Sequence, residues 1–169
     1  MNVNESVNRS EVDELRNFFA DISATPQFTR RSTNIPGDFR IAWRLSVLCL
    51  LLRRGRANTL ALEHLHVLWW SVRSEATRSL LLRWFKGEGR PDEMLVRFDP
   101  SLSVTLDLAL GQHLAEITDS GAVRLTANGA ALADAVLVQD DALVEEKTFL
   151  SALPTNITQK QIQTLLEWT

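Results

Sequence analysis

The sequence lacks the features that would cross-link the chain or carry it through a membrane. Cys49 is the only cysteine, so an internal disulfide is excluded, and its place in an apolar run indicates a buried thiol in a reducing compartment. That run, residues 47–52, is the longest apolar stretch and is far too short for a membrane helix. Residues 1–12 are polar and acidic, without the apolar core of a secretory signal. We therefore expect a soluble, cytoplasmic protein.

The motifs of common catalytic sites are also missing. No G-x-x-x-x-G-K-[ST] phosphate loop and no G-x-S-x-G nucleophile motif occur, and one cysteine cannot build a zinc ribbon. His64 and His66 are two positions apart and point to different faces of the predicted helix, which suits one metal poorly. Four acids fit a solvated helix face better than a metal cluster: Asp140, Asp141, Glu145 and Glu146. The sequence therefore predicts no enzymatic activity, no catalytic residue, no metal site and no cofactor.

The charge is divided unevenly along the chain. The net charge of −3 combines −3 over residues 1–29, +7 over residues 30–97 and −7 over residues 98–169. Twelve of the 13 cations in the middle are arginine, which suits phosphate and carboxylate groups. The pattern fits a basic surface for DNA or an acidic partner, or internal pairing of the middle with the acidic tail. The candidates for a basic surface are Arg53, Arg54, Arg56, Arg73, Arg78 and Arg83.

Residues 117–136 predict the wing of a winged-helix domain. A tight turn at residues 119–121 precedes Val123 and Leu125, which alternate with Arg124 as in a half-buried strand. Thr126 is a helix N-cap, and Gly129 with several alanines makes the next helix thin enough to pack closely on its neighbours. An ordinary hairpin followed by a core helix is the alternative. We favour a mainly α, winged-helix-like fold with a single β-hairpin at about residues 114–125.

Other capping and periodicity signals place the remaining elements. The segment 39–54, capped by Asp38 and followed by Gly55, is apolar around most of its circumference and predicts a central core helix. The short turn after it is compatible with a helix-turn-helix. Met94 to Phe98 alternates as a short strand would. Further helices are predicted over residues 10–20, from Asn58 or Thr59 to 72, over 74–86 and 99–111, and from Asp140 or Asp141 to Pro154.

Both ends of the chain are predicted to be helical arms around a core. We divide the chain into an arm at 1–37, a winged-helix-like core at 38–139 and docking helices at 140–169. Thr158 and Gln161 form a capping box for a last helix. The apolar face of that helix comprises Ile162, Leu165, Leu166 and Trp168. The face must pack on its own domain or on a partner, and the separating segment 154–156 favours a partner. The N-terminal arm leaves both options equally open.

Residues 39–70 and 96–136 together resemble the small middle component of ABC-three-component bacterial defence systems, the kind found in Lamassu operons. The resemblance implies an anti-phage or anti-plasmid complex with an SMC-like ABC ATPase and a separate effector, commonly a nuclease. The small subunit would dock on the ATPase, bridge it to the effector and help to sense foreign DNA. The resemblance implies no catalytic residue in this subunit.

The main alternative is a winged-helix transcription regulator, which reads DNA half-sites with the helix before the wing. In this chain that helix, residues 101–110, has one charge, Asp107, and no arginine or lysine. The wing offers only Arg124. Since phosphate and guanine contacts favour arginine and lysine, this helix suits groove reading poorly. A toxin or hydrolase lacks any motif, so the sequence favours a non-catalytic adaptor.

Overall fold

The structure is a computed structural model that describes residues 41–89, 96 and 99–167. The chain divides into two compact units, Met1–Asn34 and Ile35–Thr169, and the described residues all belong to the second. Several predictions fall outside the described residues: the helix over 10–20, the cap Asp38, most of the strand at 94–98, and Trp168. Val96 is described; it is buried and lies in no strand.

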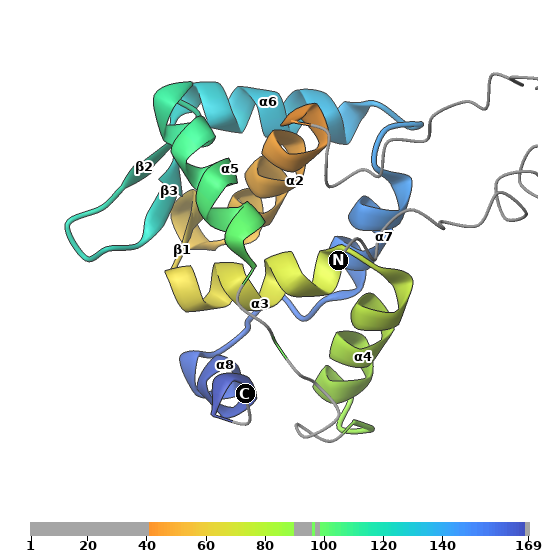
Figure 1. Ribbon diagram of the computed structural model, residues 1–169. Coiled ribbons are helices and arrows are strands. Elements are labelled where there is room, and N and C mark those ends of the chain that lie inside the picture. The colour runs from red at the N-terminus through yellow and green to blue at the C-terminus, as the bar shows by residue number, and fades with distance from the viewer. Residues whose placement is uncertain (1–40, 90–95, 97–98, 168–169) are drawn as a thin grey trace, which may run out of the picture. The chain divides into compact units, whose positions relative to one another are not determined.

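The described residues form seven α-helices and three short strands (Figure 1). The mainly helical fold predicted from the sequence is confirmed. In chain order the elements are α2 (Ile41–Arg54), the 3-10 turn η2 (Arg56–Asn58), β1 (Thr59–Leu60), α3 (Leu62–Val72), α4 (Glu75–Phe85), α5 (Pro100–Gly111), β2 (Ala115–Ile117), β3 (Val123–Leu125), α6 (Ala127–Val138), α7 (Val144–Ala152) and α8 (Gln159–Leu166).

Helix α2 is the centre of the core, as its two apolar stripes predict. Residues 47–52 are six consecutive buried positions, and Cys49 among them is 1% exposed. A helix buried on every side needs neighbours on every side. Helices α3, α5, α6 and α7 and strand β3 all pack against α2.

The predicted hairpin is present, but it belongs to a larger sheet than expected. Strands β2 and β3 pair antiparallel, with Glu116 opposite Arg124, and Gly121 in the turn has a φ of 79° that favours glycine. Strand β1 pairs with the other edge of β3, so the strand order is β1-β3-β2. The hairpin itself was predicted correctly, but the prediction that it forms the whole sheet is wrong, because the sheet has a third strand, β1.

The extra strand also corrects the predicted start of the third helix. We expected Asn58 or Thr59 to cap it, but α3 begins at Leu62, after Ala61. Ala57 and Asn58 adopt left-handed backbone conformations with φ of 53° and 58°, which end the 3-10 turn and redirect the chain. Thr59 and Leu60 are then extended and pair with β3.

Helix α6 lies close to its neighbours, as its glycine and small side chains predict. Thr126 caps it by accepting the Gly129 amide N–H at 3.2 Å. A Cβ atom added to Gly129 would lie 1.9 Å from the Leu114 carbonyl oxygen and 2.8 Å from Leu125 Cδ2. The absence of a side chain at this position therefore lets α6 approach Leu114 and strand β3.

The other capping predictions have mixed outcomes. Asp99 caps α5, with Pro100 as the first helical residue, and capping boxes begin α4 and α8. The cap expected at Asp140 or Asp141 is wrong. Helix α7 begins later, after Leu143, whose left-handed φ of 51° reverses the chain just before it.

The C-terminal helices pack on the core and are not a separate part of the second unit. Helix α7 packs on α2, and Trp43 Nε1 donates to Glu146 Oε1 at 2.9 Å. Helix α8 packs on α3. The predicted division at residue 139 therefore does not correspond to a boundary between compact units.

The close approach of α6 predicts that alanine is far more destabilising at Gly129 than at Gly111. Gly129→Ala should lower the free energy of unfolding by about 3 kcal/mol, because the new methyl group overlaps a backbone carbonyl. Gly111→Ala is the matched control, since its Cβ would meet no atom within 4 Å at the end of α5. It should be neutral or stabilise by up to about 1 kcal/mol. Urea denaturation of both variants measures this, and equal effects would contradict the close packing of α6.

Candidate functional site

Arg54, one of the arginines predicted to form a basic surface, makes hydrogen bonds within the fold instead. Its guanidinium donates to the carbonyl oxygens of Leu153 and Pro154, each at 2.7 Å, and to the carbonyl oxygen of Leu150. These carbonyls belong to the end of α7 and the segment after it. Partial burial lowers the pKa of Arg54 below its usual value. Arg54 therefore fixes the C-terminal part of the chain to the end of α2.

Two other arginines pair the basic middle of the chain with its acidic C-terminal part. Arg53 Nε lies 3.0 Å from Asp134 Oδ1 on α6, and Arg53 also donates to Asn58 Oδ1 at 2.8 Å. Arg78 forms an ion pair with Glu145 on α7 and donates to the Val72 carbonyl oxygen at 2.9 Å. The side chain of Arg78 is only 13% exposed. Arg53 and Arg78 therefore form ion pairs within the fold, which was the alternative to a binding surface.

The remaining three candidates differ in their surroundings. Arg73 pairs with the Asp99 carboxylate. Burial raises the pKa of Asp99, but hydrogen bonds from Ser101 and the Arg73 charge outweigh it and leave the pKa below its usual value. Arg83 donates to the Glu88 carbonyl oxygen at 3.4 Å. Arg56 is exposed, and its side chain makes no hydrogen bond or ion pair with the described residues.

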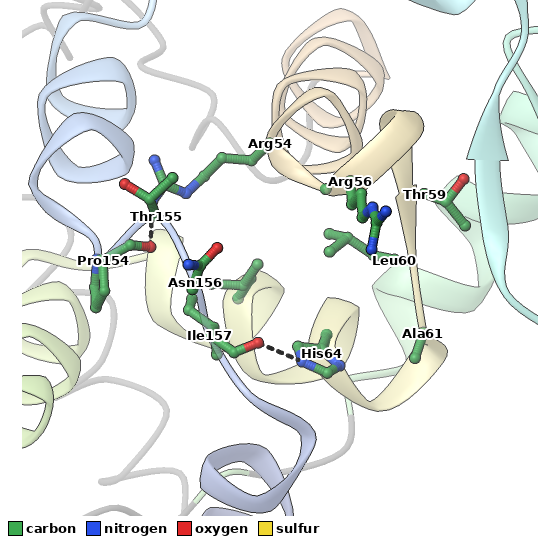
Figure 2. A pocket seen from close by; sticks show the side chains of 12 residues that line it. Arg54, Arg56, Thr59, Leu60, Ala61, His64, Pro154, Thr155, Asn156 and Ile157 are labelled. Carbon is green, nitrogen blue, oxygen red and sulfur yellow. Dashed lines mark hydrogen bonds between the residues drawn. The ribbon is translucent and has the colours of Figure 1, made fainter.

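Arg56 lies at the edge of a cavity of about 260 Å³ that the sequence did not predict (Figure 2). The cavity opens between two segments far apart in the chain, residues 54–68 and residues 154–157. Its polar and charged lining is basic or neutral, without an acidic side chain among the described residues, and comprises Arg54, Arg56, Thr59, His64, Thr155 and Asn156. The two histidines of α3 have different surroundings. His64 lines this cavity, whereas His66 does not line it and is buried, with 7% of its surface exposed.

A second groove runs between α4 and α7. It encloses about 480 Å³ and combines apolar side chains, such as Leu82 and Phe149, with Glu75 and with Arg78 and Glu145, which pair with each other. Since the ion pair satisfies two of its charged groups, the groove presents little unpaired charge to a ligand.

The exposed surface of α5 and of both sides of the β2–β3 hairpin, called the α5–hairpin face below, is acidic and partly apolar. Glu116 and Arg124 lie on one side of the hairpin, and Ile117, opposite Val123, lies on the other. Arg124, its one cation in the described residues, lies 2.6 Å from Glu116, while Asp107 and Asp119 add negative charge. Two apolar side chains are largely exposed: Val104 on α5 at 51% and Ile117 on β2 at 63%. The hairpin projects from the start of α6 (Figure 1). Such a face suits a protein surface better than a phosphate backbone.

Most of the proposed docking residues of the last helix are buried in their own domain. Ile162 and Leu165 are both 0% exposed, and Leu166 is partly buried against the same core. The outward residues of α8 are polar, among them Gln159, Lys160 and Gln163. Ile162 and Leu165 therefore pack on their own domain. The sequence had favoured packing on a partner over packing on the domain.

The described residues include no cluster of three or more His, Cys, Asp or Glu side chains that could hold a metal ion. Burial raises the pKa of the Cys49 thiol to about 11, which disfavours the reactive thiolate. No helix in the described part of the chain is long and apolar enough to cross a membrane.

Comparisons with protein-family models, with curated proteins and with solved structures found no significant match to the chain.

Arg54 should contribute more to the stability of the fold than Arg56, because only Arg54 has internal hydrogen bonds among the described residues. Arg54→Ala should lower the free energy of unfolding by about 3 kcal/mol, because it removes charged hydrogen bonds and leaves three carbonyl oxygens without their donor. Arg56→Ala removes the same charge from an exposed site and should stay within about 0.5 kcal/mol. Chemical denaturation checks both values. Equal stability of the two variants would show that the Arg54 contacts do not hold the fold.

Proposed function

We propose that this protein is a non-catalytic adaptor subunit that docks on an SMC-like ABC ATPase in a bacterial anti-phage or anti-plasmid complex. The resemblance of residues 39–70 and 96–136 to the middle component of ABC-three-component systems supports this setting. In it the subunit is cytoplasmic and links the ATPase to a separate effector nuclease. DNA is engaged through the assembled complex.

The face formed by α5 and the hairpin is the observation that carries the proposal. Its only described cation, Arg124, is paired with Glu116, and Asp107 and Asp119 give it a negative balance. Val104 and Ile117 expose β-branched side chains on the same two elements. A face with exposed apolar groups and no free positive charge fits a protein partner, because association with proteins is driven by apolar burial.

The order of elements supports a winged-helix-like arrangement of this face. Helix α2 precedes β1, three helices lie between β1 and β2, and the strand order is β1-β3-β2. The β2–β3 hairpin then takes the place of the wing and α5 that of the helix before it. In this proposal the arrangement serves as a protein-docking module.

The alternative, a winged-helix transcription regulator, is less well supported. A recognition helix needs side chains that donate to phosphates and base edges. Helix α5 has Asp107 as its one charged residue. Any DNA contact of the described residues would then fall on exposed cations elsewhere, such as Arg53 and Arg56.

The proposal predicts that charge placed on the α5–hairpin face weakens docking. Ile117→Asp and Val104→Asp should each reduce the affinity for the proposed SMC-like ATPase partner by at least about tenfold, since a carboxylate replaces an apolar contact that docking would bury. Val138→Asp is the matched control. Val138 is 77% exposed and ends α6, roughly 17 Å along the helix axis from the hairpin.

Biolayer interferometry on the co-expressed ATPase measures the three affinities. We expect Val138→Asp to bind within about twofold of the unsubstituted chain. Equal losses from all three variants would contradict the assignment of this face. A chain that binds no ATPase, but binds a palindromic duplex as a symmetric dimer, would overturn the adaptor function in favour of the regulator.

A further inference from the structure

The cavity between residues 54–68 and 154–157 has the chemistry of an anion site. It contains two guanidinium groups and an imidazole, and none of its described lining residues is acidic. Arg54 lies on its wall, but that side chain is already bonded to three carbonyl oxygens. Arg56 makes no bond to the described residues, so its fork of donors is available to a ligand.

The backbone holds Arg56 at the cavity by a constrained turn. Ala57 and Asn58 both have positive φ, which is uncommon for residues other than glycine. Arg53 donates to Asn58 Oδ1 at 2.8 Å, and Thr59 Oγ1 donates to the Ala57 carbonyl oxygen at 3.1 Å. These bonds fix the turn, so Arg56 reaches the cavity from a defined position rather than from a loose loop.

Polar groups face this arginine from the other side and from the floor. Figure 2 shows Arg56 and Leu60 on one side, Pro154, Thr155 and Asn156 on the other, and His64 below them. The side chains of Thr155 and Asn156 make no hydrogen bond to the described residues. Each therefore has a donor to offer from a direction different from that of Arg56.

His64 adds an imidazole to the lining of the cavity. Its Nε2 atom lies 3.4 Å from the Ile157 carbonyl oxygen, while its Nδ1 atom is buried and has no hydrogen-bond partner among the described residues. A buried polar atom without a partner is rare, because it loses its bonds to water without replacement. Since Nδ1 is covered by protein, the imidazole contributes to the cavity as part of its lining and not through this atom.

We propose that this cavity binds a small phosphate monoester. Donors arranged around the cavity suit the three terminal oxygens of a phosphate better than the two coplanar oxygens of a carboxylate, and arginine binds phosphate with a bidentate fork. The apolar side chains of Leu60, Leu68 and Ile157 line the rest of the space and would contact the group that the phosphate carries. The volume of about 260 Å³ admits a compact ligand such as a mononucleotide.

The test uses the full chain and four probes: inorganic phosphate, adenosine monophosphate, adenosine, and sodium chloride at matched ionic strength. Isothermal titration calorimetry should show saturable binding of phosphate and tighter binding of adenosine monophosphate. Arg56→Ala should weaken both by at least about tenfold, because it removes charged hydrogen bonds to the phosphate. Arg124→Ala removes an equal charge from the hairpin, outside the cavity, and should change them by less than about twofold.

Three results would overturn the proposal. They are no saturable binding of either phosphate probe at about 10 mM, equal loss in the Arg56 and Arg124 variants, and adenosine binding as tightly as its monophosphate. An unchanged melting temperature of Arg56→Ala shows that a loss of binding is not unfolding. The proposal is separate from docking on the ATPase, which depends on the α5–hairpin face, so either can fail without the other.

Discussion

Burial of α2 on all sides is the constraint on which the described structure depends. A helix with six consecutive buried residues cannot be covered by one sheet or one neighbouring helix. The chain covers it with α3, α5, α6, α7 and β3, which come from both its basic middle and its acidic C-terminal part. Polar groups at the end of α2 are thereby brought against distant segments. Arg53 and Arg54 meet α6 and the end of α7 for this reason.

The charge division along the sequence acquires a structural explanation from these contacts. Arg53 pairs with Asp134, Arg78 with Glu145 and Arg73 with Asp99, so that arginines of the middle meet acids of the C-terminal part. Exposed pairs of this kind contribute little stability individually, but the partly buried Arg54 and Arg78 also satisfy backbone carbonyl oxygens. Arg56 is different, because it faces a cavity and has no internal partner among the described residues.

Features with local signals could be predicted from the sequence. The caps at Ser74, Asp99, Thr126 and Thr158 form between residues two or three positions apart, and the hairpin turn is equally local. Strand β1 could not be predicted in the same way, because it has two residues and its partner β3 lies more than 60 residues away. The start of α7 was missed because Leu143 adopts a conformation that is uncommon for leucine.

The candidate sites were harder to predict for a related reason. The sequence shows that Arg54 and Arg56 are cations near a helix end, but not that one is tied to carbonyls about 100 residues away while the other faces a cavity. The cavity lies between residues 54–68 and residues 154–157. These two segments come together only because α7 and α8, on either side of residues 154–157, pack on α2 and α3. Likewise, the apolar face of α8 is evident in the sequence, whereas its packing on α3 is a tertiary contact.

Native-state hydrogen exchange tests most directly whether the C-terminal helices are part of the α2 core. If Arg54, Trp43 and the packing of α7 join them to α2, the slowest amides of α7 should open with a free energy within about 1 kcal/mol of those in residues 47–52. Both sets would then exchange through the same global unfolding. Exchange of the α7 and α8 amides at opening free energies lower by more than about 3 kcal/mol would contradict this and would mark residues 140–167 as a detachable arm.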